Sequence, residues 1–448
     1  MIPPRYVVIG SGIAGLAAAE AMRQRVPGAQ ITMFSDEPHP FYSRPGLAYL
    51  LRGDIPEKQL WIRRPEDLAA LRLQRVHALV DTIDFLRREV VLLGGHRFRY
   101  DRLLIATGAQ AVPPPFLPSP IPGTFKLDSL DDARSLLQSA RRGETAIVVG
   151  GGITALEIAE GLLARKMNVH YFLRGDRYWS DVLDEVESQI VMGRLIHEGL
   201  NLHLNTQVKQ LIVAKGQVAG VETQDGAMIP CQLLAAAIGV RPRLELAKKS
   251  GLAVDRGIIV NPQLQTSVAD VYAAGDVAQI RESDGKLGSL DVLWPTALNQ
   301  GRLAGENMTG AKRSFVKKTP FNVTQLAGLK VTIIGAVGDG KTKDLVAIAR
   351  GDSESWRMGV QSWAVSERDD VNRVRLMVGE TTIVGALVMG DQTWSQPLQR
   401  LISEQVDVTP IREALSKGSA SALTRLAQFY QQWEQRQPKR STIETPRI

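Results

Sequence analysis

Two glycine-rich turns are the features of this sequence best suited to bind a ligand. In the first, YVVIGSGIAG, Gly10, Gly12 and Gly15 follow an apolar run and lead into a segment rich in Ala and Leu. Glycines at this spacing allow a tight turn, let the backbone approach a pyrophosphate and bring the next helix close to the strand. The amide groups at the start of that helix favour negative charge. The sequence therefore predicts a dinucleotide bound at residues 10–15.

The second turn, AIVVGGGITALEIAEGL, repeats this pattern with Gly150, Gly152 and Ala155. Each copy closes with another apolar run that ends in glycine, LLIATG at Gly108 and LLAAAIG at Gly239. One such turn alone is weak evidence, but two with matching closing runs are strong. A strand, a glycine turn and a helix, found twice, predict two parallel, doubly wound sheets, each with its own dinucleotide.

An acid follows the second strand of the first copy, ITMFSDEP. A carboxylate at that strand end can accept hydrogen bonds from both hydroxyls of an adenosine ribose. Asp36 is the predicted residue for this role, and Glu37 is the alternative.

The corresponding strand end of the second copy reads VHYFLRGDRYW and differs in charge. Leu173 stands where an acid would select NADH, and Arg174 and Arg177 follow it. Guanidinium groups suit the 2′-phosphate of NADPH, so NADPH is the expected donor. The alternatives are that the arginines face solvent, or that Asp176 between them serves a ribose and NADH is used as well.

The single cysteine, Cys231, limits the redox chemistry that the chain can do. One cysteine cannot form an intrachain disulfide, a CxxC pair or a thiolate cage for zinc or an iron–sulfur cluster. Its setting in the apolar stretch IPCQLLAAAIG predicts a buried, inert thiol, although a redox-active sulfenic acid is the alternative. The six histidines show no spacing typical of a metal site.

Length and composition indicate a globular chain of about three domains. No apolar run approaches the roughly 20 residues of a membrane span, and the first residues carry no secretory pattern, so a cytoplasmic protein is expected. The net charge of +7 can steer an acidic partner or simply aid solubility. Nucleic-acid binding is not expected, because the basic residues are dispersed and not interleaved with aromatic ones.

Taken in order, GSGIAG, IATG, GGGITALE, VYAAGDVA and LWPTALNQGRLAGENMTG resemble the FAD-dependent pyridine-nucleotide oxidoreductases. The branch most similar holds rubredoxin reductases, ferredoxin reductases and the nitrite reductase flavin subunit. The resemblance implies an α/β fold with two Rossmann-like dinucleotide-binding domains, the NAD domain inserted in the FAD domain, and a C-terminal α+β interface domain. The implied bounds are 1–112 and 245–315 for the FAD domain, 113–244 for the NAD(P) domain, and 316–448 for the C-terminal domain with its tail.

The resemblance also implies roles for single residues around the flavin. Asp276 would bond a ribitol hydroxyl of FAD, Glu157 would reach the nicotinamide, and Arg44, in FYSRPGLAYLL, would lie beside the isoalloxazine. A cation near that ring favours reduced flavin by charge attraction. Tyr49 departs from the pattern, since relatives often carry lysine five residues after the arginine, which puts a Glu–Lys pair in doubt. The other implied cofactor contacts are Thr107, Gly108, Gly239, Gly275 and Trp294, although Trp294 is alternatively a core residue.

The expected function is hydride transfer from NAD(P)H to FAD, followed by single-electron transfer to a small ferredoxin-like or rubredoxin-like carrier. With no cysteine pair, reduction of a disulfide through a protein dithiol is excluded. One alternative is a flavin subunit of a larger redox complex, and another is a redox-sensing flavoprotein with little turnover. The C-terminal module is expected to serve as a homodimer interface or an acceptor platform, with a stripe of apolar residues packed on the body or a partner: Leu423, Leu426, Tyr430 and Trp433.

Overall fold

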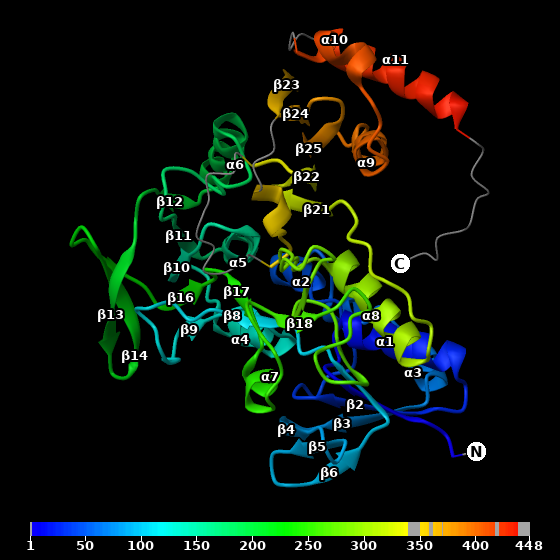
Figure 1. The fold of residues 1–448 in the computed structure, drawn as a ribbon. Coiled ribbons are helices and arrows are strands. Elements are labelled where there is room, and N and C mark those ends of the chain that lie inside the picture. Colours follow the sequence, from blue (N-terminus) through cyan, green and yellow to red (C-terminus); the bar gives the residue numbers. More distant parts are fainter. Residues whose placement is uncertain (1, 339–349, 358–361, 370, 417–420, 438–448) are drawn as a thin grey trace. The chain divides into compact units, whose positions relative to one another are not determined.

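The computed structural model describes residues 2–338, 350–357, 362–369, 371–416 and 421–437 (Figure 1). The chain forms two compact units. The larger unit comprises Met1–Arg174, His203–Lys317 and Val346–Ser353, and the smaller unit comprises the remaining stretches, Gly175–Leu202, Lys318–Leu345 and Glu354–Ile448. The tail that follows Gln437 lies outside the described residues.

The first sheet of the larger unit is parallel and has the strand order β19-β7-β1-β2-β3. Helix α1, Ile13–Arg25, follows β1, and α8, Trp294–Met308, packs against α1 through Gly301 and Gly305. Strand β19 joins this sheet from beyond the second glycine turn, so the second domain is inserted in the first, as predicted. The strands are β1 Arg5–Ile9, β2 Gln30–Ser35, β3 Leu73–His77, β7 Arg102–Ile105 and β19 Val271–Ala273.

The second sheet has the order β12-β11-β10-β16-β9 and repeats the plan of the first. Its central strands β11, β10 and β16 are parallel, and α5, Ile153–Ala164, follows β10 as α1 follows β1. The predicted α/β class with two Rossmann-like domains is confirmed. The predicted domain bounds stay a prediction, and Gly175–Leu202, within the predicted NAD(P) domain 113–244, belongs to the smaller unit. The strands are β9 Thr124–Phe125, β10 Thr145–Val149, β11 Asn168–Phe172, β12 Asn201–His203 and β16 Leu233–Ala236.

Smaller sheets and short helices complete the larger unit. Two of the smaller sheets are antiparallel and have three strands each, β13-β14-β15 and β4-β5-β6. The other two are the antiparallel pair β17–β8 and the parallel pair β18–β20. The strands are β4 Val80–Asp84, β5 Glu89–Leu92, β6 Arg97–Arg99, β8 Ala109–Ala111, β13 Val208–Ala214, β14 Gln217–Thr223, β15 Met228–Pro230, β17 Val240–Pro242, β18 Ile258–Val260 and β20 Ala278–Ile280; the helices are α2 Gly46–Arg52, α3 Pro65–Ala70, α4 Leu130–Ser139 and α7 Glu245–Lys249.

The smaller unit contains a five-stranded antiparallel sheet of order β21-β22-β25-β24-β23. The segment RVRLMVGETTIVGALVMG forms the hairpin β24–β25. The elements are β21 Phe321–Leu326, β22 Leu329–Gly335, β23 Trp363–Asp369, β24 Asn372–Val378 and β25 Ile383–Met389, with α6 Glu185–His197, α9 Ser395–Ser403, α10 Arg412–Ser416 and α11 Ser421–Arg436.

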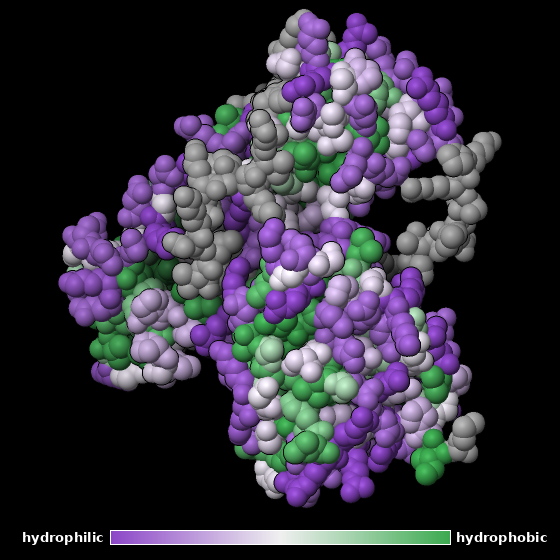
Figure 2. Space-filling view, viewed as in Figure 1, coloured by the Kyte–Doolittle hydropathy of each residue, from purple (hydrophilic) through white to green (hydrophobic). Residues whose placement is uncertain are grey.

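The apolar stripe of α11 packs on the core of the smaller unit. Leu426 is fully buried, and Tyr430 and Trp433 are partly buried against the same cluster. The guanidinium of Arg400 lies 5.7 Å from the ring centre of Tyr430 and 4.8 Å from that of Trp433. Packing on the body is therefore confirmed for this stripe, and in the view of Figure 2 the outer residues along α11 are mostly hydrophilic.

Candidate cofactor site

The first glycine turn forms an open cradle at the start of α1. Gly10 has φ +112°, and a Cβ added there would lie 2.1 Å from the carbonyl oxygen of Ala106. A Cβ on Gly15 would lie 2.1 Å from the carbonyl oxygen of Gly10. Gly12, by contrast, is the N-cap residue of α1, and nothing lies within 4 Å of its added Cβ. The turn is therefore closed against the sheet and open above the helix N-terminus, which fits a pyrophosphate.

The second glycine turn resembles the first at its first glycine and at the start of its helix. Gly150 has φ +146°, and its added Cβ would lie 2.2 Å from the carbonyl oxygen of Ala237. Gly152 is the N-cap of α5 and no side chain caps that helix. The hydroxyl of Thr154, in the first turn of α5, is buried and has no hydrogen-bond partner among the described residues. Both turns thus offer free helix N-termini, and the residues present fit two dinucleotides.

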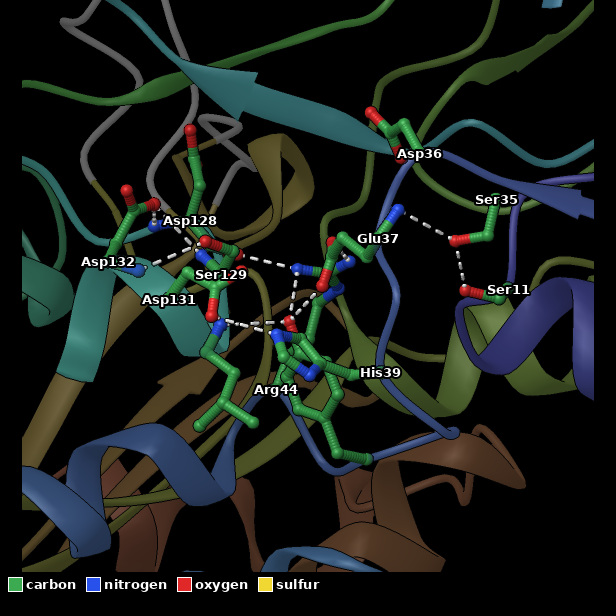
Figure 3. A network of polar contacts seen from close by, with 12 residues as sticks. Ser11, Ser35, Asp36, Glu37, His39, Arg44, Asp128, Ser129, Asp131 and Asp132 are labelled. Carbon is green, nitrogen blue, oxygen red and sulfur yellow. Dashed lines mark hydrogen bonds and ion pairs between the residues drawn. The ribbon is translucent and has the colours of Figure 1, made fainter. Parts of the chain in front are cut away.

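The two acids at the end of β2 lie in different surroundings (Figure 3). Glu37 accepts a hydrogen bond from the Tyr42 hydroxyl at 2.7 Å and forms an ion pair with Arg44. Asp36 points away from this network, is 49% exposed, and its carboxylate lies 3.0 Å from Arg243. Both acids are paired with an arginine, but Glu37 is only 14% exposed, so Asp36 is the more accessible of the two. Its contact with a ribose stays a prediction.

Arg44 is part of a neutral cluster. Its guanidinium pairs with Glu37 and donates hydrogen bonds to the hydroxyl of Tyr42 at 3.1 Å and the carbonyl oxygen of Asp128 at 2.6 Å (Figure 3). Burial raises the pKa of the Tyr42 phenol. The charge of Arg44 is therefore already balanced by Glu37, a partner that the sequence pattern around Arg44 did not indicate.

Two carboxyl groups of the larger unit have strongly raised pKa values. Burial raises the pKa of Asp276, which follows β19, to about 6, against the opposing charges of Arg350 and Arg44. Burial and then the charge of Glu160 raise the pKa of Glu157, on α5, to about 8, against Arg52 and Arg350. Carboxyl groups perturbed in this way are typical of functional sites.

Arg350 is the residue of this site that the sequence did not reveal. It forms an ion pair with Asp128 at 2.7 Å, and its charge acts on both Asp276 and Glu157. No motif surrounds it in the stretch AIARGDSES. Only the fold brings it next to residues that are more than 70 positions away in the chain.

Helices α2 and α5 are in close contact beside Glu157. A Cβ on Gly161 would lie 2.8 Å from the Cβ of Leu51, so glycine permits the approach. Arg52 pairs with Glu160 at 3.1 Å and stacks at 4.9 Å on the ring of Tyr49. Tyr49 stands where relatives often carry lysine. In this chain the cation on α2 is Arg52, one turn further along the helix.

The predicted 2′-phosphate residues are distributed over both units. Leu173 is buried, and Arg174, directly after it, is exposed. Arg174 belongs to the larger unit with the second glycine turn, whereas Arg177 belongs to the smaller unit and pairs with Asp176 at 3.4 Å. The structure thus places only Arg174 in the same unit as the turn.

The remaining predicted contacts follow strands of both parallel sheets or begin α8. Gly108, Gly239 and Gly275 all have positive φ, which glycine adopts without strain. Thr107 donates a hydrogen bond to the carbonyl oxygen of Arg243 at 3.3 Å. Trp294 begins α8, is partly buried, and its ring centre lies 6.0 Å from that of Phe41.

The lone cysteine Cys231 lies in the interior of the larger unit. The thiol of Cys231 is buried, as predicted, and burial raises its pKa to about 11, which favours an unreactive thiol. Among the residues described, no cluster of His, Cys, Asp or Glu could hold a metal ion. In the same part of the chain, no helix combines the length and apolar character needed to cross a bilayer.

Comparison with known proteins identifies the family. Residues 4–301 match the model of the pyridine nucleotide-disulphide oxidoreductases. The chain belongs to this family. It is 30% identical over 392 residues to the biphenyl dioxygenase system ferredoxin–NAD(+) reductase component of Paraburkholderia xenovorans, covering 85% of this chain and 93% of that one.

Two further similarities extend over almost the whole chain. The nitrite reductase [NAD(P)H] of Bacillus subtilis is 28% identical over 438 residues, which cover 94% of this chain but 50% of that longer protein. The crystal structure of a covalent putidaredoxin reductase–putidaredoxin complex matches with a TM-score of 0.82 at 22% identity, covering 96% of this chain and 99% of that one. The fold is thus that of a reductase with two dinucleotide-binding domains. A single cysteine excludes the intrachain redox disulfide for which the family is named.

Proposed function

We propose that this chain binds FAD at the first glycine turn and NAD(P)H at the second, and passes electrons to a small one-electron carrier. The observation that carries the proposal is the pair of open cradles within one compact unit, which also contains Asp276 and Glu157. When bound, FAD accepts a hydride and can release its electrons one at a time. The chain's own residues bind and orient the two nucleotides.

The carrier is proposed from the names of relatives and from charge. The Paraburkholderia relative is named as a ferredoxin reductase, and a Pseudomonas putida relative with 28% identity over 338 residues is named as a rubredoxin reductase. A net charge of +7 would attract an acidic carrier protein. We further propose a cytoplasmic location, where a lone unpaired cysteine is the usual state.

We propose NADPH as the preferred donor. Leu173 offers no carboxylate to an adenosine 2′-hydroxyl, and exposed Arg174 can bind a 2′-phosphate. Each charge-assisted contact is worth about 1.5–3 kcal/mol, or roughly tenfold or more in affinity. NADH stays the alternative, since the Paraburkholderia and Pseudomonas relatives are named as NAD(+) reductases.

The test is anaerobic stopped-flow reduction of the FAD-loaded protein by NADPH and by NADH, followed at the flavin absorption band. Faster bleaching with NADPH supports the proposal, and Arg174→Gln should then weaken NADPH alone. Arg165→Gln is the matched control, because Arg165 is an exposed arginine at the opposite end of α5. If neither nucleotide bleaches the flavin, the proposed function is wrong.

A second candidate function is a flavin subunit of a larger redox complex. The match to half of the Bacillus nitrite reductase favours it. Co-purification with a metalloprotein would distinguish this role from a free reductase, and turnover with an artificial one-electron acceptor would separate both from a redox sensor. For the smaller unit we propose either a homodimer interface or an acceptor platform, which sedimentation with and without the carrier would distinguish.

A further inference from the structure

Arg350 enters the larger unit from a part of the sequence outside both dinucleotide-binding motifs. Its guanidinium lies 2.7 Å from Asp128, and its side chain is 21% exposed while that of Asp128 is 2% exposed. The Nε of Arg350 is buried and has no hydrogen-bond partner among the described residues. One part of the guanidinium is therefore bound by Asp128. The Nε is shielded from water and makes no hydrogen bond to the described residues.

The backbone next to Arg350 is fixed in place. The N–H of Gly351 donates to the carbonyl oxygen of Val292 at 2.9 Å, and the N–H of Val292 donates to that of Asp352 at 3.0 Å. The hydroxyl of Ser353 donates to the carboxylate of Asp291. These bonds attach residues 351–353 to the strand-like stretch that leads into α8, so Arg350 starts from a defined position.

The charge of Arg350 reaches the two carboxyl groups assigned to the cofactors. It lowers the pKa of Asp276 and that of Glu157, in each case against the larger effect of burial. Arg44 acts on Asp276 as well, but Arg350 acts on both. An arginine that influences both groups lies near the place where the flavin and the nicotinamide would meet.

The charge balance distinguishes Arg350 from Arg44. Arg44 faces one carboxylate, Glu37, and the pair is neutral. Asp128 faces two cations, Arg350 at 2.7 Å and Lys126 at 2.9 Å, so its carboxylate does not neutralise Arg350 alone. A bound flavin that accepted a hydride would gain one negative charge. A cation that is only partly neutralised by its partner would stabilise that reduced cofactor.

We propose that Arg350, held by Asp128 and by the 351–353 backbone, is the positioning cation of the redox site and raises the reduction potential of the bound flavin. Arg52 also acts on Glu157, but it is paired with Glu160 and Asp54, and Arg44 is paired with Glu37. This inference rests on the proposed function, because it assumes FAD at the first glycine turn.

The test is the midpoint potential of the FAD-loaded protein, measured by reductive titration against a reference dye. Arg350→Gln should shift the equilibrium toward oxidised flavin at least tenfold, which for a two-electron couple is a fall of about 30 mV. Arg350→Lys keeps the charge and should restore most of the potential. Arg350→Met, which keeps the apolar stem, takes the place of Arg350→Gln if that variant does not fold.

Lys126→Gln is the matched control, because it removes the other cation from the same carboxylate of Asp128, and its side chain is 54% exposed. Lys126 is more exposed than Arg350, whose side chain is 21% exposed, and Arg350 is the cation of this pair that acts on Asp276 and Glu157. Removal of Lys126 should therefore lower the potential by less than removal of Arg350. An unchanged potential in the neutral Arg350 variants, or an equal fall in Lys126→Gln, would overturn the proposal. The titration uses a chemical reductant and therefore measures the effect of Arg350 independently of NADPH and NADH. Failure of both nucleotides to reduce the flavin would refute the proposed function but would leave this measurement possible.

Discussion

Substitution of alanine for Gly10 should lower the stability of the fold, whereas the same substitution at Gly12 should lower the affinity for FAD. In Gly10→Ala, the new Cβ would meet the carbonyl oxygen of Ala106 at 2.1 Å, at a φ of +112° that alanine rarely adopts. Backbone strain of about 1–3 kcal/mol and overpacking of about 1–3 kcal/mol give a loss of roughly 2–6 kcal/mol in folding free energy. Gly10→Ala is therefore expected to damage the fold itself.

In Gly12→Ala, nothing of the protein lies within 4 Å of the new Cβ, and the backbone, at φ −72° and ψ −176°, suits any residue. Folding free energy should change by no more than about 1 kcal/mol, the difference between N-cap residues. The methyl group would occupy the space of the pyrophosphate, so the dissociation constant for FAD should rise at least tenfold, or about 1.4 kcal/mol.

The assays are urea unfolding of the apoproteins and titration of each with FAD, followed by quenching of flavin fluorescence. Gly28→Ala is the control, because Gly28 is equally open but follows the opposite end of α1. If Gly12→Ala binds FAD as tightly as the wild type, the pyrophosphate does not rest on this turn and the assignment of the cradle is refuted.

Three other predictions concern Glu157, Gly161 and Cys231. Because the pKa of Glu157 in the folded chain, about 8, lies above its ordinary value of 4.5, its contribution to stability is complete below about pH 4.5 and is lost as the pH rises through 8. Glu157→Gln should flatten the decline of the urea midpoint between about pH 5 and pH 9, and an equally steep decline would contradict this pKa. Gly161→Ala should destabilise the fold by about 1–3 kcal/mol by forcing α2 from α5, whereas Gly193→Ala, in an open part of α6, should gain up to about 1 kcal/mol of helix propensity; equal urea midpoints would refute the close contact. Cys231→Ala should leave flavin reduction unchanged, and native protein should react with iodoacetamide only on unfolding; rapid labelling of the folded chain would exclude a buried thiol.

The sequence predicted those parts of the structure that depend on short-range patterns. Each glycine turn and the strand and helix that flank it lie within about 25 residues, and their spacing states the backbone geometry directly. Asp276 was named through the family resemblance of the short segment VYAAGDVA, and its role stays a prediction.

The charge pairs were out of reach because they join distant parts of the chain. Arg350 and Asp128 are 222 residues apart, and Arg52 and Glu160 are 108 apart. A lone arginine carries no periodicity that would tell an ion pair in a cofactor site from a solvated surface charge. The association of α6 with the smaller unit also depends on distant residues. The buried Glu187 of α6 forms ion pairs with Arg373 and Arg375 of β24.

The backbone bonds of Val292 limit how far this protein can be shortened. Val292 is 5% exposed, and both its N–H and its carbonyl oxygen are satisfied by residues 351–352. A chain that ended at Lys317 would keep both dinucleotide motifs but leave these two buried groups unpaired, at a cost of about 1–3 kcal/mol each. The defect would lie two residues before Trp294 and the start of α8. A free-standing version of the larger unit must therefore include residues 350–353, joined to it by a new linker.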